Sequence, residues 1–134
     1  MRCLKFLKER RAQAEARALG YRFQNKTKEA IRQLQHSLDL NIALHGNFKE
    51  EVASAYEALG SAYETDQNIE AAFYAYLQAK DIYQLLETKE AREKRDSLQT
   101  RLKIFIQTHQ QTLRKAKQEK IAAEDENILL EKLI

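Results

Sequence analysis

The sequence contains no proline in 134 residues, and its three glycines are Gly20, Gly46 and Gly60. Proline and glycine interrupt helices most strongly, whereas the strong helix formers Ala, Leu, Glu, Lys, Gln and Arg are abundant in this chain. A β-sandwich or barrel would need many more turn residues than are present. We therefore expect an all-α fold.

Apolar residues recur at helical spacing along most of the chain, and short polar stretches divide them into segments. The pattern predicts helices up to about residue 23 and over about 28–44, 49–63, 69–86 and 90–105. Gly46 is the clearest stop signal, because glycine readily takes the left-handed backbone that ends helices. We expect Asp66 or Asn68 to cap the helix that follows. Beyond residue 105 the chain either continues as a helix or bends near His109.

Three features of the composition bear on the compartment. Cys3 is the only cysteine, so no disulfide can form within the chain. Residues 1–11 place Lys5 and Lys8 among their apolar residues and lack the uninterrupted apolar stretch of a signal peptide. No window approaches the ~20 apolar residues of a membrane span. These features favour a soluble, cytoplasmic protein.

The net charge of +3 is unevenly distributed. Residues 1–32 carry +7 and residues 33–70 carry −6, while residues 94–120 carry +6 and residues 121–134 carry −3. Such blocks suggest that segments neutralise one another in the fold or that one face is basic. Ordinary solvated helix faces explain the blocks equally well.

A short motif occurs twice, because Ala18-Leu19-Gly20 is repeated forty residues later as Ala58-Leu59-Gly60. The two copies then continue in similar ways, with a polar turn that is two residues shorter in the first. The residues that follow are Phe23, Ala30, Leu34 and Ser37 in the first copy, and Tyr63, Ala72, Tyr76 and Ala79 in the second. Both copies predict a helix, a short turn and a second helix.

The second copy resembles the tetratricopeptide repeat, whose pattern of large and small residues is matched without a gap by Tyr56, Leu59, Gly60, Tyr63, Ala72, Tyr76 and Ala79. Small residues let two helices approach closely, and the tyrosines fill the space beside them. We therefore expect Gly60 to lie against Ala72 or Ala79, and the residues expected to be buried are Tyr56, Leu59, Tyr63, Tyr76 and Ile82. Residues 44–53 and the long period are similar to the repeats of kinesin light chains. The resemblance implies a short α-solenoid over 1–105, with repeats at about 14–44 and 53–86 and a capping helix at 90–105. A charged helix over 106–134 follows this domain.

In that family the first helices of successive repeats line a concave groove that receives a peptide or helix. The resemblance therefore implies an adaptor or scaffold whose partner is a protein or peptide. Glu57 and Glu64 would favour a basic or polar ligand. The groove positions carried over by offset are Arg17, Tyr21, Gln24 and Asn25 in the first repeat, and Ser54, Glu57, Ser61, Glu64 and Thr65 in the second.

Residues that could carry catalysis are few and scattered. His36, His45 and His109 lie far apart, no His or Cys pair shows metal-ligand spacing, and no Gly-rich phosphate loop is present. We therefore expect no enzymatic activity, no metal and no other cofactor. Nucleic-acid binding by the basic stretches 5–11 and 114–120 is the main alternative. No aromatic residue interleaves with the second stretch, so base stacking there is unsupported.

The C-terminal segment suggests self-association. Residues spaced alternately three and four apart from Ile106 to Ile134 follow the spacing of the apolar face of a coiled coil. Lys120 and Asn127 fall on this face and fit it poorly. The final residues include Leu129, Leu130 and Leu133, large apolar side chains that would gain free energy from burial. We expect a homodimer through this segment, and the alternatives are a helix docked in a partner's groove or one packed back on the repeats.

Overall fold

A computed structural model describes residues 2–133, except for the side chains of Arg2, Leu129 and Leu133. No strand occurs within residues 2–133, which confirms the all-α expectation. The bounds of α2 to α5 differ from the predicted ones by at most three residues at either end. The six helices are α1 (Arg2–Phe23), α2 (Thr27–His45), α3 (Glu50–Thr65), α4 (Ile69–Leu85), α5 (Lys89–Thr108) and α6 (Gln110–Leu133).

The helix ends follow local chemistry. Gly46 has a φ of 82° and ends α2, as expected for a residue without a Cβ. The side chain of Asn68 accepts a hydrogen bond of 3.3 Å from the backbone N–H of Ala71 and so caps α4. Thr88 caps α5 in the same way. The predicted cap at Asn68 is thus confirmed, while Asp66 lies at the C-terminal end of α3.

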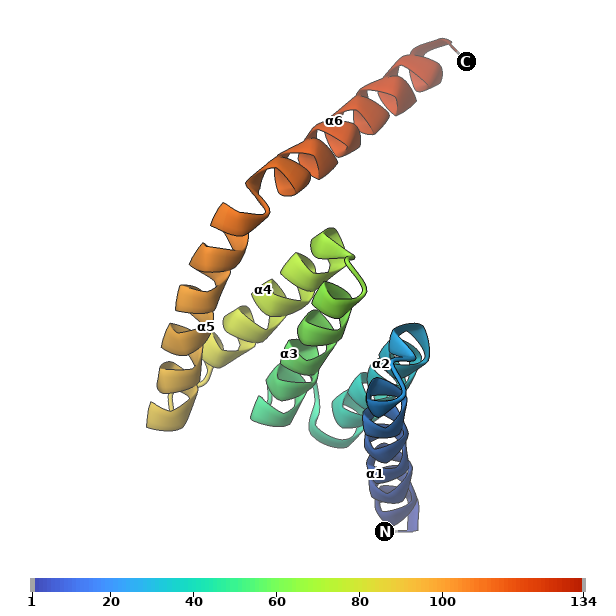
Figure 1. The fold of residues 1–134 in the computed structure, drawn as a ribbon, viewed down its shortest axis with the longest axis vertical. Helices are drawn as coiled ribbons and strands as arrows, with labels where there is room; N and C mark the ends of the chain where they lie inside the picture. The colour runs from blue at the N-terminus through green and yellow to red at the C-terminus, as the bar shows by residue number, and fades with distance from the viewer. Residues whose placement is uncertain (1, 134) are drawn as a thin grey trace.

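Each helix packs against its neighbour along the chain, and the two most extensive contacts are those of α1 with α2 and of α3 with α4 (Figure 1). A hydrophobic core extends from α2 to α5. Leu59, Tyr76 and Ile82 are buried in it as predicted. Tyr56 and Tyr63, which we also expected to be buried, are half-buried because they border a groove that is open to solvent.

Gly60 lies on the side of α3 that faces α4. A Cβ added at this residue would lie 2.6 Å from the ring of Tyr76, so the ring occupies the space that the glycine leaves. The nearest neighbour of Gly60 is therefore the Tyr76 ring, and not the predicted Ala72 or Ala79. The small residue makes room for an aromatic ring in the facing helix.

The turns that close the two helix pairs have the same hydrogen-bond pattern. The backbone N–H of Lys26 bonds to the carbonyl of Tyr21 at 2.8 Å, and that of Asn68 bonds to the carbonyl of Tyr63 at 2.9 Å. Asn25 and Gln67 carry the positive φ in these turns, at 58° and 63°. Corresponding residues of the two turns therefore lie 42 positions apart.

This spacing corrects the alignment of the first helices, which the sequence motif placed 40 residues apart. With a spacing of 42, Gly60 corresponds to Ala18, which is 2% exposed, and not to Gly20, whose added Cβ would meet nothing within 4 Å. Leu19, 58% exposed, likewise does not correspond to Leu59, 3% exposed. The repeated Ala-Leu-Gly motif thus occupies different environments in the two pairs.

α6 begins at the bend that we expected near His109. The backbone N–H of His109 bonds to the carbonyl of Phe105, and the ring of His109 lies 4.7 Å from that of Phe105. α6 contacts α4 and α5 near its start, where Leu113 packs on the core, and then runs away from the other helices (Figure 1). Within residues 2–133, no helix combines the length and the apolar character needed to cross a bilayer.

Candidate functional site

A groove runs between α3 and α5, with side chains of α4 in its floor. It contains two hollows of about 400 Å³ and 260 Å³, and Arg101 borders both of them. Tyr83 and Leu98 line the larger hollow, and Tyr76 and Phe105 line the smaller one. We call this feature the α3–α5 groove, and its polar side chains are Ser54, Glu57, Glu64, Glu90, Glu93, Lys94, Ser97, Arg101, Thr108 and His109.

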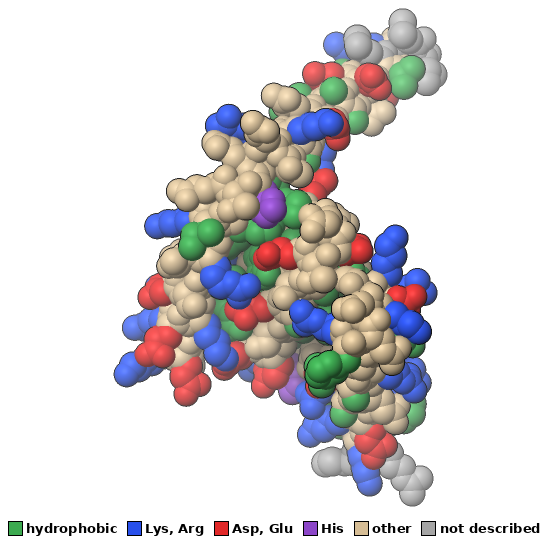
Figure 2. Space-filling model, in the orientation of Figure 1, with side chains coloured by type: hydrophobic (Ala, Val, Ile, Leu, Met, Phe, Trp, Pro, Cys, Tyr) green, Lys and Arg blue, Asp and Glu red, His purple; other side chains and the backbone are tan. Residues whose placement is uncertain are grey.

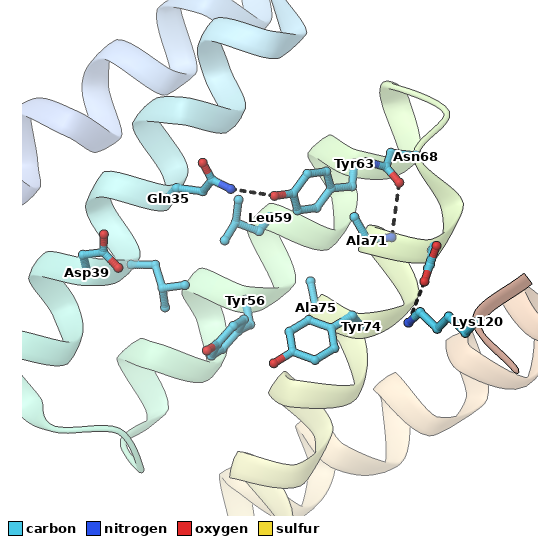
Figure 3. Close-up of a pocket in the computed structure, with 12 residues that line it drawn as sticks. Gln35, Asp39, Tyr56, Leu59, Tyr63, Asn68, Ala71, Tyr74, Ala75 and Lys120 are labelled. Carbon is cyan, nitrogen blue, oxygen red and sulfur yellow. Dashed lines mark hydrogen bonds and ion pairs between the residues drawn. The ribbon is translucent and has the colours of Figure 1, made fainter. Parts of the chain in front are cut away.

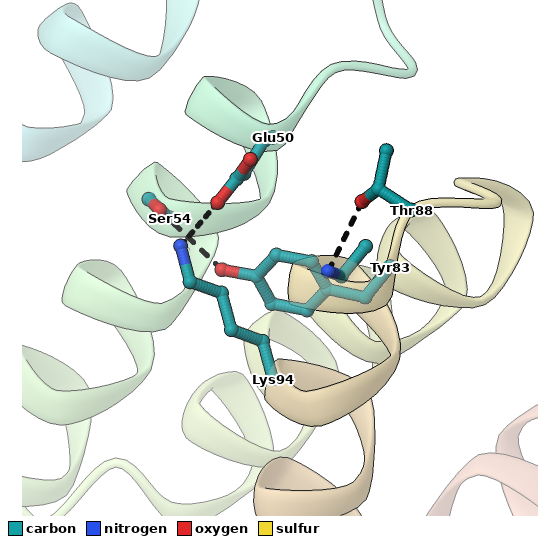
Figure 4. Close-up of polar contacts among 6 residues, drawn as sticks. Glu50, Ser54, Tyr83, Thr88 and Lys94 are labelled. Carbon is teal, nitrogen blue, oxygen red and sulfur yellow. Dashed lines mark hydrogen bonds and ion pairs between the residues drawn. The ribbon is translucent and has the colours of Figure 1, made fainter.

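One end of the α3–α5 groove is organised by Tyr83 and Lys94 (Figure 4). The hydroxyl of Tyr83 lies 3.4 Å from that of Ser54 on α3. The ammonium group of Lys94 on α5 forms an ion pair with Glu50 and lies 5.9 Å from the centre of the Tyr83 ring. The carboxylate of Glu50 raises the pKa of Lys94. These contacts join the N-terminal parts of α3 and α5.

The other end is organised by Tyr76, which is 3% exposed. Its hydroxyl donates a hydrogen bond of 2.6 Å to the carboxylate of Glu64 and accepts one of 3.2 Å from Arg101. The guanidinium of Arg101 also lies 5.2 Å from the centre of the Tyr76 ring. Burial and the hydrogen bond to Glu64 raise the pKa of Tyr76, so the phenol keeps its proton. Glu64 and Arg101 are thus fixed by a buried group between them.

Glu57 lies between these two ends and differs from Glu50 and Glu64. Burial raises the pKa of Glu57, and the nearby Arg101 acts in the opposite direction. No cation of the described residues forms an ion pair with Glu57, Glu90 or Glu93. The larger hollow is therefore bordered by three carboxylates that remain available to a ligand.

A second groove lies on the other side of α3, between α2 and α4 (Figure 3). Its hollow of about 720 Å³ is bordered by Tyr56, Tyr63 and Tyr74, and we call it the tyrosine groove. The amide of Gln35 donates a hydrogen bond of 2.7 Å to the hydroxyl of Tyr63. Burial raises the pKa of Tyr56. Tyr74 is 61% exposed.

This second groove was not predicted from the sequence. Tyr56 and Tyr63 matched positions of the repeat that were assigned to the core, and Tyr74 fell outside the motif. A usable signal was the presence of three tyrosines within residues 56–74, two of them in the most acidic block of the chain. Exposed tyrosines are common in protein interfaces.

The predicted groove residues of the second repeat fall along one helix. Ser54, Glu57 and Glu64 border the α3–α5 groove, and Ser61 accepts a hydrogen bond of 3.2 Å from Arg22 of α1. Thr65 is exposed, and its hydroxyl donates to the backbone carbonyl of Ser61.

The predicted groove residues of the first repeat border neither hollow of the α3–α5 groove. Gln24 and Asn25 form the turn after α1, Arg17 is exposed, and Tyr21 corresponds to Tyr63. The physical reason is that both hollows lie between α3 and α5, so no residue of α1 borders them. The spacing of 42 residues also moves every corresponding α1 position by two. Under that spacing Arg22 corresponds to Glu64, and its contact with Ser61 places it beside α3. Arg22 was missed by the sequence prediction.

The residues proposed for self-association are described only in part. Leu130 is 57% exposed, while the side chains of Leu129 and Leu133 lie outside the described ones. Among the side chains that the structure describes, no group of three or more His, Cys, Asp or Glu residues is arranged to hold a metal ion. Cys3 is exposed.

The surface carries its charges in distinct places. On the face shown in Figure 2, lysine and arginine side chains gather along α1, whereas acidic and basic side chains are mixed over α5.

Compared with models of known protein families and with curated protein sequences, the chain matches none. The function must therefore be inferred from the geometry and charges of its own residues.

Proposed function

We propose that this protein is a binding module that holds a polypeptide segment in the α3–α5 groove, and that it acts without catalysis. The observation that carries the proposal is the border of the larger hollow. Of its two cations, Lys94 is paired with Glu50 and Arg101 donates a hydrogen bond to Tyr76, while Glu57, Glu90 and Glu93 have no ion-pair partner among the described residues. A ligand with a lysine or arginine would supply the missing charge and enter above the apolar floor.

The architecture supports this proposal. Two helix pairs with the same turn, spaced 42 residues apart and followed by a fifth helix, fit a short tetratricopeptide-like array. In such an array the first helices of successive units face the ligand, and α3 and α5 hold those positions here. The lone cysteine and the charged composition favour the cytoplasm as the place of action.

The test begins with a peptide library displayed on phage and selected against the full chain. We expect selected peptides to carry at least one lysine or arginine beside an apolar residue. Their affinities are then measured by calorimetry for the parent, for Glu57→Gln and for the matched control Glu51→Gln. Glu51 is exposed on the same helix and borders neither hollow of the α3–α5 groove. Because a hydrogen bond to a charged group contributes roughly 1.5–3 kcal/mol, Glu57→Gln should weaken binding about tenfold or more.

Three outcomes would overturn this assignment. Selected peptides without basic residues would contradict the charge argument. Equal binding by Glu57→Gln and the parent, with a loss on Tyr74→Ala, would move the site to the tyrosine groove. Binding of nucleic acid below micromolar at physiological salt, lost on replacing Lys115, Lys117 and Lys120, would replace the polypeptide ligand by a phosphate backbone.

A further inference from the structure

The distal half of α6, residues 121–133, lies away from the other helices (Figure 1). Ile121, Ile128 and Leu130 in this half are 49%, 50% and 57% exposed. A helix of this length without tertiary contacts is only marginally stable in water. Covering each of these side chains would contribute roughly 1.5–3 kcal/mol. The segment therefore has the properties of a docking helix whose partner lies outside the single chain.

The base of α6 offers a surface that matches this segment. A hollow of about 440 Å³ lies between α4 and α6, and its apolar border consists of Phe73, Ile106, Leu113 and Ala116. The cations Arg114, Lys117 and Lys120 stand around the same hollow. Lys120 is already paired with Glu70 of α4 at 2.7 Å, which leaves Arg114 and Lys117 without an ion-pair partner among the described residues. The site fits an apolar helix that carries negative charge.

Residues 121–133 have that chemistry. Glu124, Asp125, Glu126 and Glu131 carry four negative charges beside the isoleucines and leucines, and Lys132 carries the one positive charge. The segment cannot reach the hollow of its own chain, because α6 is one continuous helix whose distal half points away from its base (Figure 1). Its complement is therefore the same hollow in a second molecule.

We propose that two copies of this chain associate through antiparallel α6 helices, with the acidic distal half of each lying along the basic hollow of the other. The arrangement is two-fold symmetric, so both hollows are filled and no binding surface is left over. Leu113 and Leu130 lie 17 residues apart, about 25 Å along a helix. An antiparallel pair can thus bring Leu130 of the second copy beside Leu113 at both ends. A parallel pair would instead place like charges together.

The experiment measures the mass of the full chain by light scattering from one to one hundred micromolar, with circular dichroism to check helix content. Reversing the basic side by Arg114→Glu and Lys117→Glu should raise the dissociation constant at least tenfold, because like charges then face each other. Reversing the acidic side by Glu124→Lys and Glu126→Lys should do the same. Combining all four changes in one chain should restore the dimer, since opposite charges again face each other. Lys103→Glu, an exposed change on α5 outside the hollow, is the control and should leave the dimer intact.

A parent chain that is monomeric over the whole range would overturn the proposal. So would single-side reversals that remain dimeric with unchanged helix content. If the four-fold variant folds but stays monomeric, the two halves of α6 do not face each other and the antiparallel arrangement is wrong. None of these outcomes depends on a ligand in the α3–α5 groove.

Discussion

The two helix pairs have the same turn and the same spacing but different interiors. In the first pair, buried Ser37 donates a hydrogen bond to Glu15, and buried Asn41 accepts one from Arg11. The corresponding positions in the second pair, 42 residues on, are Ala79 and Tyr83, both buried among apolar neighbours. Both pairs thus have polar contacts between their helices, but in the second pair these contacts are made by the hydroxyls of two buried aromatic rings, Tyr76 and Tyr83.

The two pairs also differ in the residues that pack between their helices. Ala18 and Leu34 in the first pair correspond to Gly60 and Tyr76 in the second. A larger ring on one helix goes with a smaller residue on the other, so the two changes compensate each other in volume. This teaches that the two pairs reach similar geometry by different packing, and that the second pair depends more on a single glycine.

The largest expected effect is that of Gly60→Leu. The added side chain would overlap the Tyr76 ring, which is itself held by Glu64, Arg101 and the ring of Phe105, 5.8 Å away. Overpacking costs ~1–3 kcal/mol and more where neighbours cannot move, so we expect a loss of about 3 kcal/mol in the free energy of unfolding. Urea denaturation measures it. The matched variant Gly20→Leu has open space around it and should not destabilise the protein. Equal losses in both variants would contradict the close contact between Gly60 and the Tyr76 ring as the cause of the destabilisation.

A smaller effect comes from giving the second pair the residues of the first. Gly60→Ala alone should cost about 1–3 kcal/mol, because its Cβ would lie 2.6 Å from the Tyr76 ring. In the background Tyr76→Leu the same change should cost less, since the ring is gone. A double-mutant cycle should therefore give a coupling free energy of about 1 kcal/mol or more. Strictly additive effects would disprove the compensation between the two positions.

The smallest effect at neutral pH belongs to Tyr76→Phe, which removes a hydroxyl that the first pair lacks at Leu34. Losing its hydrogen bonds should cost about 0.5–1.5 kcal/mol at pH 7. The pKa of Tyr76 is raised above 10.0 in the folded state, so the folded protein keeps a proton that the unfolded chain loses. The stability linked to Tyr76 is therefore complete below pH 10 and falls above it, by up to ~1.4 kcal/mol per pH unit.

Denaturation at pH 9, 10 and 11 measures this dependence. Above pH 10 the free energy of unfolding should fall less steeply with pH for Tyr76→Phe than for the parent. Burial also raises the pKa values of Tyr56 and Tyr83, so part of this fall should remain in both proteins. Tyr74→Phe, a change at an exposed ring, should match the parent at pH 7. Parallel curves for the parent and Tyr76→Phe would contradict the buried hydroxyl.

The six helices were predictable because their ends depend on local chemistry. Gly46, Asn68 and Thr88 act on the backbone within a few residues, so the sequence around them carries the information. The burial of Leu59 and Tyr76 was also predictable from helical periodicity. These features need no knowledge of how distant helices are placed.

The register of the first pair was not predictable in the same way. The repeated Ala-Leu-Gly motif suggested that the two pairs lie 40 residues apart. That alignment required the first turn to be two residues shorter than the second, and this gap indicated an error of two residues. The α3–α5 groove was anticipated on α3 alone, because the partners Lys94 and Arg101 belong to a helix whose placement depends on the whole array. The tyrosine groove depends on how α2 and α4 diverge over α3, and short-range patterns do not report that.

The bend at His109 has a mechanical consequence. α6 has 24 residues, so it is a rod of about 36 Å attached at one end. A change of about ten degrees at its base would displace the far end by roughly 6 Å, more than one helical turn. The packing of His109 on Phe105, the contact of Leu113 with the core and the Lys120–Glu70 ion pair together set where the distal half of α6 points. We expect a substitution at His109 to alter the reach of this arm more than the stability of the fold.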